Sequence, residues 1–228
     1  MVATIRCIFC KLDSTKSRSL EHIIPESLGN EDHCLPRGVV CDQCNNYFAR
    51  KVEKPVLESE MLRAIRADRQ IANKRGIVPT VRGTESRLPD YRTMGRFLGK
   101  VGIEAMAQSV LNVPNWNDEL VENAGLDKLR RYVRYNVGRD AWPFAFRTLY
   151  PVNAVFSEDG VVFEVPHEFR LLVTDTFEFY IVLALFGVEF VMNLGGPTLD
   201  GWMRWLSENR GNSPLYPPKG QDHLPGQA

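Results

Sequence analysis

The sequence lacks an excess of either charge, because its 228 residues contain 28 Lys and Arg against 28 Asp and Glu. A balanced chain does not attract nucleic acid or an acidic ligand through its overall field, so such a partner must meet a local patch. The sequence also has no internal repeat and no long low-complexity segment. With 44% hydrophobic residues, it has the composition of a globular protein of one large domain or two small ones.

Segments that direct a chain into or across a membrane are also missing. The N-terminus, MVATIRCIFCKLD, has neither the long apolar core nor the small-residue cleavage site of a secretory signal peptide. The most apolar run, FYIVLALFGVEFVMNLGG, is interrupted by Gly187 and Glu189 before it reaches the roughly 18 apolar residues that a membrane helix needs. We therefore expect a cytoplasmic protein without a membrane partner, and we interpret this run as buried strands.

Cysteine is absent from the chain after Cys44, and all five cysteines lie within residues 7–44. A disulfide framework is not expected in a protein without export signals, so this cluster indicates metal ligands or redox groups. Four of the cysteines form two CxxC pairs, Cys7 with Cys10 and Cys41 with Cys44. Each CxxC turn directs two sulfurs at one point, and two turns supply the tetrahedral thiolate set that structural zinc prefers.

The competing interpretations of the CxxC pairs are a redox site and unrelated buried thiols. A thioredoxin-type site needs one pair beside a βαβ pattern, and this region has no such pattern. We therefore predict one structural Zn²⁺, whose four closed ligands leave no open coordination position for chemistry. Cys34 is interpreted as a loop thiol outside the ligand set.

Between the two pairs the chain must run out and return, because zinc would hold both ends. We predict a strand containing Glu21 and His22, a turn-rich loop, and a return strand at Val39-Val40. A helix that begins around Cys44 then has Asn45 in its first turn. This order brings Glu21, His22 and Asn45 towards one small volume.

These segments resemble the zinc-stapled branch of the HNH endonucleases, which share a ββα-metal fold. The resemblance lies in the CxxC pairs, EHIIP, RGVVCDQCNN and KVEKP, and it covers about the first 55 to 60 residues. The RGVVCDQCN piece is also similar to the corresponding segment of the endonuclease VII type of junction resolvase. The resemblance implies a metal-dependent endonuclease that hydrolyses DNA, as a nick or a double-strand cut, with RNA as the alternative substrate.

By position, the resemblance assigns separate roles to the polar residues between the cysteines. Glu21 stands where the family has a metal-binding acid, more often Asp, and His22 stands at the general base. Asn45 stands at the second protein ligand of the catalytic Mg²⁺ or Mn²⁺, and Asn46 is the candidate to replace or supplement it. The residue for the third letter of the HNH pattern, often a histidine later in the helix, is absent. Glu53 lies eight residues beyond Asn45 on the same helix face, where it is expected to orient the site.

Elementary chemistry agrees with these residue types. Phosphodiester cleavage needs a base that titrates near neutral pH, which suits imidazole. It also needs a hard divalent cation with oxygen ligands, and Glu21 and the Asn45 side chain offer such oxygens. Adjacent strand residues point to opposite faces, so Glu21 and His22 are expected to approach the phosphate from different sides.

Basic residues concentrate on or just after the next predicted helix: Arg63, Arg66, Arg69, Lys74 and Arg75. Lys and Arg bind phosphate groups with little sequence preference, so this cluster can follow a nucleic-acid backbone. A solvated helix face is the equal alternative, because Glu58, Glu60 and Asp68 lie nearby.

The rest of the chain changes from helical to strand patterns near Trp142. Apolar spacing predicts helices at residues 55–76, 94–111 and 117–135, with Pro55 ending the helix before them. From Trp142 onward the chain is rich in β-branched and aromatic residues between Pro, Gly and Asp, which predicts an antiparallel sheet. A last helix is predicted at residues 199–209.

The predicted fold class is α+β, in three parts. Residues 1–57 are the HNH unit, residues 58–212 form a helical and antiparallel-sheet domain that binds substrate or a partner, and residues 213–228 are a flexible tail. The leading hypothesis is an endonuclease in phage defence or a mobile element, with a homodimer or an activating protein as partner. The alternative is a zinc-stapled nucleic-acid or protein-binding module without catalysis.

Overall fold

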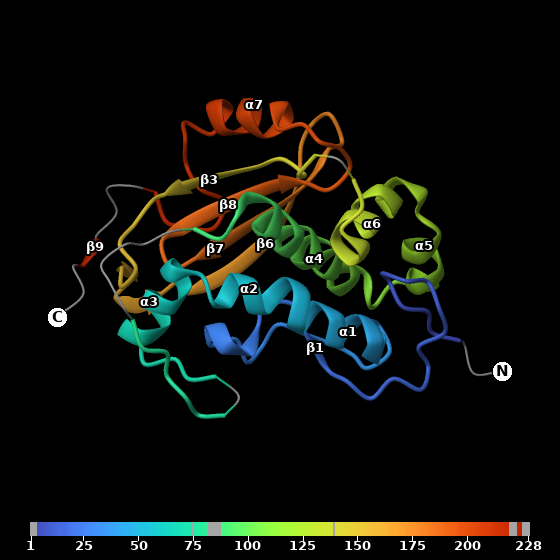
Figure 1. Ribbon diagram of the computed structural model, residues 1–228. Helices are drawn as coiled ribbons and strands as arrows, with labels where there is room; N and C mark the ends of the chain where they lie inside the picture. The colour runs from blue at the N-terminus through green and yellow to red at the C-terminus, as the bar shows by residue number, and fades with distance from the viewer. Residues whose placement is uncertain (1–3, 74, 82–87, 139, 219–222, 225–228) are drawn as a thin grey trace. The chain divides into compact units, whose positions relative to one another are not determined.

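The computed structural model is an α+β protein, as the sequence predicts, with most helices in its N-terminal part and most strands in its C-terminal part (Figure 1). Two compact units divide the chain, residues 1–142 and 143–228, so the predicted boundary after residue 57 lies inside the first unit. The structure describes residues 4–73, 75–81, 88–138, 140–218 and 223–224. Within these ranges, none of the helices combines the length and the apolar character needed to cross a bilayer.

The first unit contains a two-stranded antiparallel sheet of β1 (Glu21–His22) and β2 (Cys34–Leu35), in which His22 pairs with Cys34. The prediction of a return strand at Val39-Val40 is wrong, since that strand is β2. Cys34 therefore lies in a strand and not in a loop. The reason is a turn at Gly38, whose φ of 92° directs Val39 towards the first cysteine loop, where its carbonyl accepts the Ile8 N–H at 3.0 Å.

The helix after the last cysteine does not end at Pro55, contrary to the prediction. α1 (Asp42–Phe48), the π turn η2 (Ala49–Glu53) and α2 (Lys54–Leu57) form one length of helix (Figure 1). In the π turn the Lys54 N–H bonds the Ala49 carbonyl, five residues back. Pro55 then lies in the first turn of α2, where a missing N–H is tolerated, so the wider turn lets the helix continue through the proline.

Two of the predicted longer helices are each interrupted. The 55–76 segment breaks where the Ser59 hydroxyl caps a new helix by accepting the Leu62 N–H at 3.5 Å. The 117–135 segment breaks at Asn123, whose side chain accepts the Gly125 N–H at 2.9 Å. The resulting elements are α3 (Glu60–Asp68), α4 (Tyr91–Val110), α5 (Trp116–Glu122), η3 (Ala124–Leu126) and α6 (Asp127–Tyr135).

α4 and α6 pack closely together in the first unit. A Cβ at Gly99 of α4 would lie 2.6 Å from Cγ2 of Val133 on α6, so only glycine permits this approach. The same helix α4 also contacts β2, η2 and α2, which places it beside the elements that carry the predicted site residues.

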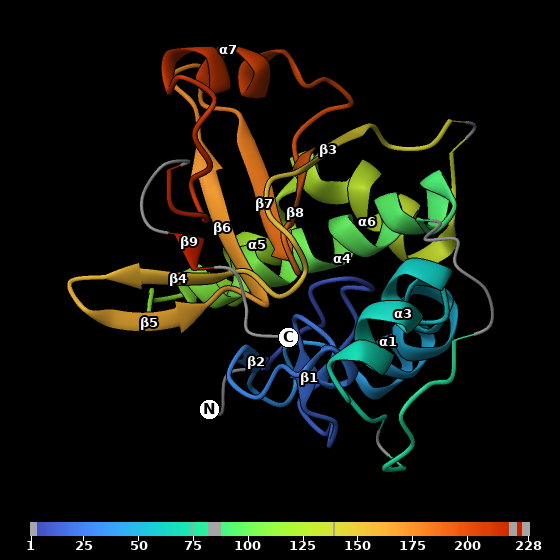
Figure 2. The same cartoon turned by 90° about the vertical axis from the view of Figure 1, so that its left-hand side faces the viewer.

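The second unit confirms the predicted antiparallel sheet, which has the strand order β3-β8-β7-β6. α7 (Asp200–Glu208) covers one face of it, where Trp202 packs with Tyr180, Val182 and Val191. β4 and β5 form a hairpin in a separate sheet, in which β9 pairs with β4 on the side away from β5 (Figure 2). The strands are β3 (Phe144–Thr148), β4 (Val155–Glu158), β5 (Val161–Glu164), β6 (His167–Val173), β7 (Phe179–Leu185), β8 (Val188–Asn193) and β9 (His223–Leu224).

The start of the predicted tail is packed against the second unit. The buried Tyr216 hydroxyl accepts the Gly187 N–H at 2.8 Å, and the Ser213 hydroxyl donates to the Glu189 carboxylate. Residues 213–218 are therefore held by hydrogen bonds to β8 and the turn before it.

Candidate metal and nuclease site

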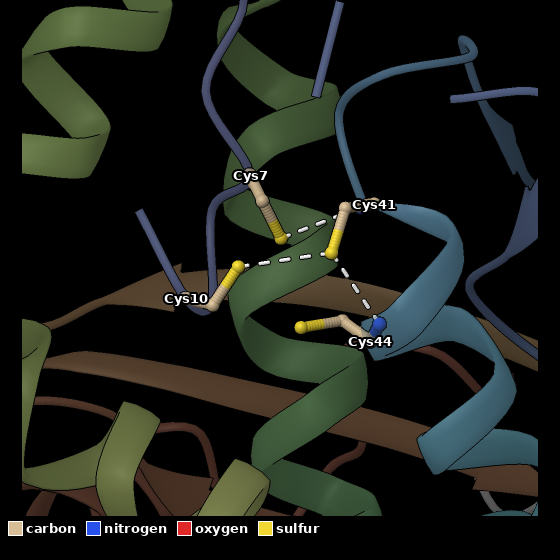
Figure 3. Close-up of side chains that lie close together, drawn as sticks. All are labelled: Cys7, Cys10, Cys41 and Cys44. Carbon is tan, nitrogen blue, oxygen red and sulfur yellow. Dashed lines mark hydrogen bonds between the residues drawn. The ribbon is translucent and has the colours of Figure 1, made fainter. Parts of the chain in front are cut away.

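The four CxxC cysteines converge on one point, as their spacing predicts (Figure 3). Their sulfurs all lie within 4.8 Å of one another, and those of Cys10 and Cys41 are 3.7 Å apart. In a tetrahedral site with Zn–S bonds of about 2.3 Å, neighbouring sulfurs lie about 3.8 Å apart. The donors are thiols and their arrangement fits a tetrahedral metal ion. Cys34 lies outside the group, with its sulfur directed to the Glu31 carbonyl.

Backbone N–H groups point at two of these sulfurs. The Cys41 N–H donates to Cys7 Sγ and the Cys44 N–H donates to Cys41 Sγ, each at 3.4 Å (Figure 3). Contact with the Cys10 thiol lowers the pKa of Cys41 and raises the pKa of Cys7 and Cys44. The thiols therefore resist ionising together, and a divalent cation is the group that offsets four converging thiolates.

An arginine that the sequence analysis did not single out supports this metal site. Arg134 of α6 is buried and donates from Nε to Cys44 Sγ at 3.2 Å. Its guanidinium lies over the Tyr47 ring, 4.0 Å from the centroid. A positive charge in this position reduces the excess negative charge that four thiolates leave on a divalent ion. The sequence signal was an arginine four residues after Arg130, directly following the apolar Val133 of α6.

Glu21 and His22 point to opposite sides of β1, as the alternation of a strand predicts. Glu21 is 4% exposed and its Oε1 lies 2.8 Å from Nζ of Lys100. His22 is half-buried and lies opposite Cys34 in the two-stranded sheet. The acid therefore faces the interior of the first unit, while the imidazole lies on the face that solvent reaches.

Asn45 joins helix α1 to the strand that carries this pair. Its Nδ2 donates to the Leu20 carbonyl, directly before Glu21, at 3.0 Å. Asp42, also on α1, accepts the Ser19 N–H at 2.8 Å and fixes the approach to the strand. Asn45 therefore lies against the residue that directly precedes β1, whereas Asn46 is exposed on α1.

Glu53 belongs to the same group of residues through Lys100. Its Oε1 lies 2.8 Å from Lys100 Nζ, the atom that also binds Glu21. The π turn changes the helical register between Asn45 and Glu53, so the predicted alignment on one α-helical face does not describe this contact. Glu53 reaches Glu21 through a shared cation on α4.

Lys100 and Glu104 of α4 are the residues that sequence reasoning missed. Both are 0% exposed, and Lys100 Nζ lies 2.9 Å from Glu104 Oε2. Burial lowers the pKa of Lys100, but the charges of Glu104, Glu21 and Glu53 outweigh it and hold that pKa well above its usual value. Burial raises the pKa of Glu104 well above its usual value. The available signal was a lysine and a glutamate four residues apart within the apolar run FLGKVGIEAMA.

The predicted basic cluster is only partly available to a ligand. Arg66 is 6% exposed, so its guanidinium is not on the surface. Arg63 is half-buried and donates to the Thr80 carbonyl at 2.7 Å. Arg69 is half-buried and Arg75 is exposed, whereas Lys74 lies outside the described residues.

Comparison with known families agrees with this geometry. Residues 7–60 match the family model described as HNH endonuclease. The match spans both CxxC pairs, the Glu21-His22 pair and Asn45, so residues 7–60 resemble an HNH endonuclease unit, and the placement of the four cysteines is consistent with its zinc-stapled type. No curated protein and no solved structure matches the chain.

The polar residues of the HNH unit also fit a second, hard divalent ion by their chemistry. The carboxylate of Glu21 and the amide oxygen of Asn45 are the donor types that Mg²⁺ and Mn²⁺ take. The Asn45 amide donates through its nitrogen, so its oxygen is the atom of the side chain that can act as an acceptor.

Proposed function

We propose that the HNH unit is a metal-dependent endonuclease that hydrolyses phosphodiester bonds in DNA. The observation that carries the proposal is the hydrogen bond from Asn45 to the Leu20 carbonyl, which brings an amide ligand to the strand of Glu21 and His22. Isolated, an Asn at a helix start is a cap and a Glu-His pair is a surface feature. Within a family-matched unit held by four cysteines, the three residues form a site.

In this proposal the two faces of β1 divide the chemistry. His22, on the accessible face, takes a proton from the attacking water, a task that suits an imidazole near neutral pH. Glu21 and Asn45 hold the Mg²⁺ or Mn²⁺ ion, which when bound offsets the charge that develops on the phosphate. Glu53 contributes through Lys100 rather than by contact with the substrate.

The remaining parts of the proposal concern zinc and the nucleic acid. The four cysteines hold a structural Zn²⁺ that fixes the two loops between which β1 and β2 lie. Arg69 and Arg75 contact the nucleic-acid backbone, whereas the buried Arg66 does not.

Cleavage of both strands at once requires two sites, which a homodimer or an activating partner supplies. HNH proteins with an attached domain often occur in phage defence or in mobile elements, and we propose this setting here.

A plasmid nicking assay with Mg²⁺ or Mn²⁺ tests the activity. We expect the wild type to convert supercoiled plasmid to nicked or linear DNA, and His22→Asn to slow this reaction by about 10²- to 10⁴-fold because the base is lost. The matched control is His33→Asn, which changes another half-buried histidine of the same unit and should retain the activity. Equal rates for wild type and His22→Asn, or no cleavage with any metal or nucleic acid, would instead favour a non-catalytic binding module.

A further inference from the structure

Lys100 is the centre of a buried charge cluster behind the proposed active site. Its Nζ lies 2.8 Å from Glu21 Oε1, 2.8 Å from Glu53 Oε1 and 2.9 Å from Glu104 Oε2. The same ammonium donates to the His22 carbonyl at 2.9 Å and approaches the Ile23 carbonyl at 3.5 Å. One side chain of α4 therefore binds three consecutive residues of the segment that carries the proposed catalytic pair.

Stability alone does not account for this arrangement. Removing an ammonium and carboxylates from water costs several kcal/mol per ion, roughly, and well-packed apolar residues often serve a core as well or better. The cluster also surrounds one lysine with three carboxylates. The desolvation cost of such a group is high for a purely structural element. We therefore ask which residues it holds in position.

The strand that Lys100 holds has little support of its own. β1 is two residues long and pairs with β2 through Glu21 with Leu35 and His22 with Cys34. So short a ladder fixes few dihedral angles, and the Glu21 side chain adds rotatable bonds of its own. The bonds from Lys100 to the Glu21 carboxylate and to the His22 carbonyl fix both the side chain and the peptide after it.

We propose that Lys100 is a positioning residue that orients the Glu21 carboxylate as a metal ligand, with Glu53 and Glu104 as its counter-charges. The inference deepens the proposed function and rests on it. A carboxylate has two oxygens, so one can accept from Lys100 while the other serves a divalent ion. Glu21 needs such a support because its side chain leaves several torsions between the backbone and the carboxylate to fix.

The test compares Mn²⁺ affinity in variants that keep the charge balance. Lys100→Met with Glu104→Met removes one buried cation and one buried anion from the same face of α4. We expect this pair variant to bind Mn²⁺ about 10- to 100-fold more weakly than the wild type, measured by electron paramagnetic resonance, with cleavage slowed in parallel. Zinc content and circular dichroism should remain those of the wild type.

A matched control is the pair variant Lys54→Met with Glu58→Met. These residues form another lysine and glutamate pair four residues apart, but their side chains are 64% and 60% exposed on and next to α2. Removing them should leave Mn²⁺ affinity and the cleavage rate unchanged. If the Lys100 and Glu104 methionine pair does not fold, Lys100→Gln with Glu104→Gln, whose amides can hydrogen-bond to the remaining carboxylates, is measured under the same criteria.

A Glu21→Gln background separates positioning from a general structural effect. If Lys100 acts through Glu21, the pair substitution should weaken Mn²⁺ binding no further once Glu21→Gln is present. A folded pair variant with wild-type Mn²⁺ affinity would overturn the proposal. So would an equal loss of Mn²⁺ affinity when the pair substitution is made in the Glu21→Gln background, or a wild type that binds no Mn²⁺. A wild type that binds Mn²⁺ in a Lys100-dependent way without cleaving nucleic acid would refute the nuclease function but not the positioning role.

Discussion

At the scale of single residues, buried cations hold the loops of the first unit. Lys100 binds carbonyls of the β1 segment, and Arg134 binds a cysteine sulfur. Arg130 donates to the Ile8 carbonyl at 2.8 Å and to the Asp127 carboxylate at 2.7 Å. Because Ile8 lies between the first two cysteines, Arg130 fastens the first cysteine loop to α6.

Replacing Arg130 by methionine should therefore destabilise the protein strongly. The change leaves the Ile8, Leu120 and Asn123 carbonyls without this donor, and we expect a loss of about 3 kcal/mol or more in the free energy of unfolding. The neighbouring Arg131 is exposed, and Arg131→Met should stay within about 0.5 kcal/mol of the wild type. Urea denaturation followed by circular dichroism measures both, and similar losses in the two variants would contradict this role.

At the scale of secondary-structure elements, two hairpins of the second unit use the same kind of turn in different surroundings. Phe186-Gly187 joins β7 to β8 and Asp159-Gly160 joins β4 to β5, with all four residues at positive φ. Such turns match the twist of the strands that they connect. The two glycines differ in what surrounds them, because Gly187 lies against the backbone of Tyr150 and Gly160 faces open space.

Alanine at these two positions should separate backbone strain from steric conflict. A Cβ at Gly160 meets nothing within 4 Å, so Gly160→Ala should cost only the strain of its φ of 79°, about 1–2 kcal/mol. A Cβ at Gly187 would lie 2.1 Å from the Tyr150 carbonyl oxygen, so Gly187→Ala should cost about 1–3 kcal/mol more. Thermal unfolding compares them, and equal losses would show that Tyr150 moves away without cost.

At the scale of the whole molecule, the metal site connects the N-terminal loop to the rest of its unit. The four cysteines come from two segments far apart in sequence, and the strands β1 and β2 lie in the chain between them. Additional contacts support the loop, including the Arg6 guanidinium with Glu122 at 2.7 Å. A pair of two-residue strands is too small to stabilise the chain between the two cysteine pairs by itself.

Loss of the metal should therefore unfold this part of the molecule. We expect about one zinc per chain by elemental analysis, loss of most of it in Cys41→Ser, and a lower melting temperature both in that variant and after chelation. Cys34→Ser is the matched control, because Cys34 lies outside the cluster and should leave zinc and melting temperature unchanged. Zinc that stays bound in Cys41→Ser would contradict the assignment of the ligands.

Much of the HNH unit was predictable because its signals are local in sequence. The CxxC spacing, the Glu21-His22 pair and the position of Asn45 after the last cysteine each specify a short-range geometry. The return strand was misplaced because Val39 and Val40 are apolar for another reason, namely burial beside the first cysteine loop. The helix was expected to stop at Pro55 because a π turn leaves no separate signal in the sequence.

The sequence by itself determined the α+β class and the convergence of four cysteines, since both follow from patterns and spacings between near neighbours. Only the tertiary structure decided that Lys100 joins Glu21, Glu53 and Glu104. Lys100 lies almost eighty residues beyond Glu21 in the chain, so no local period relates them. A buried charge acquires its partners from packing, because only packing removes the water that would otherwise solvate it.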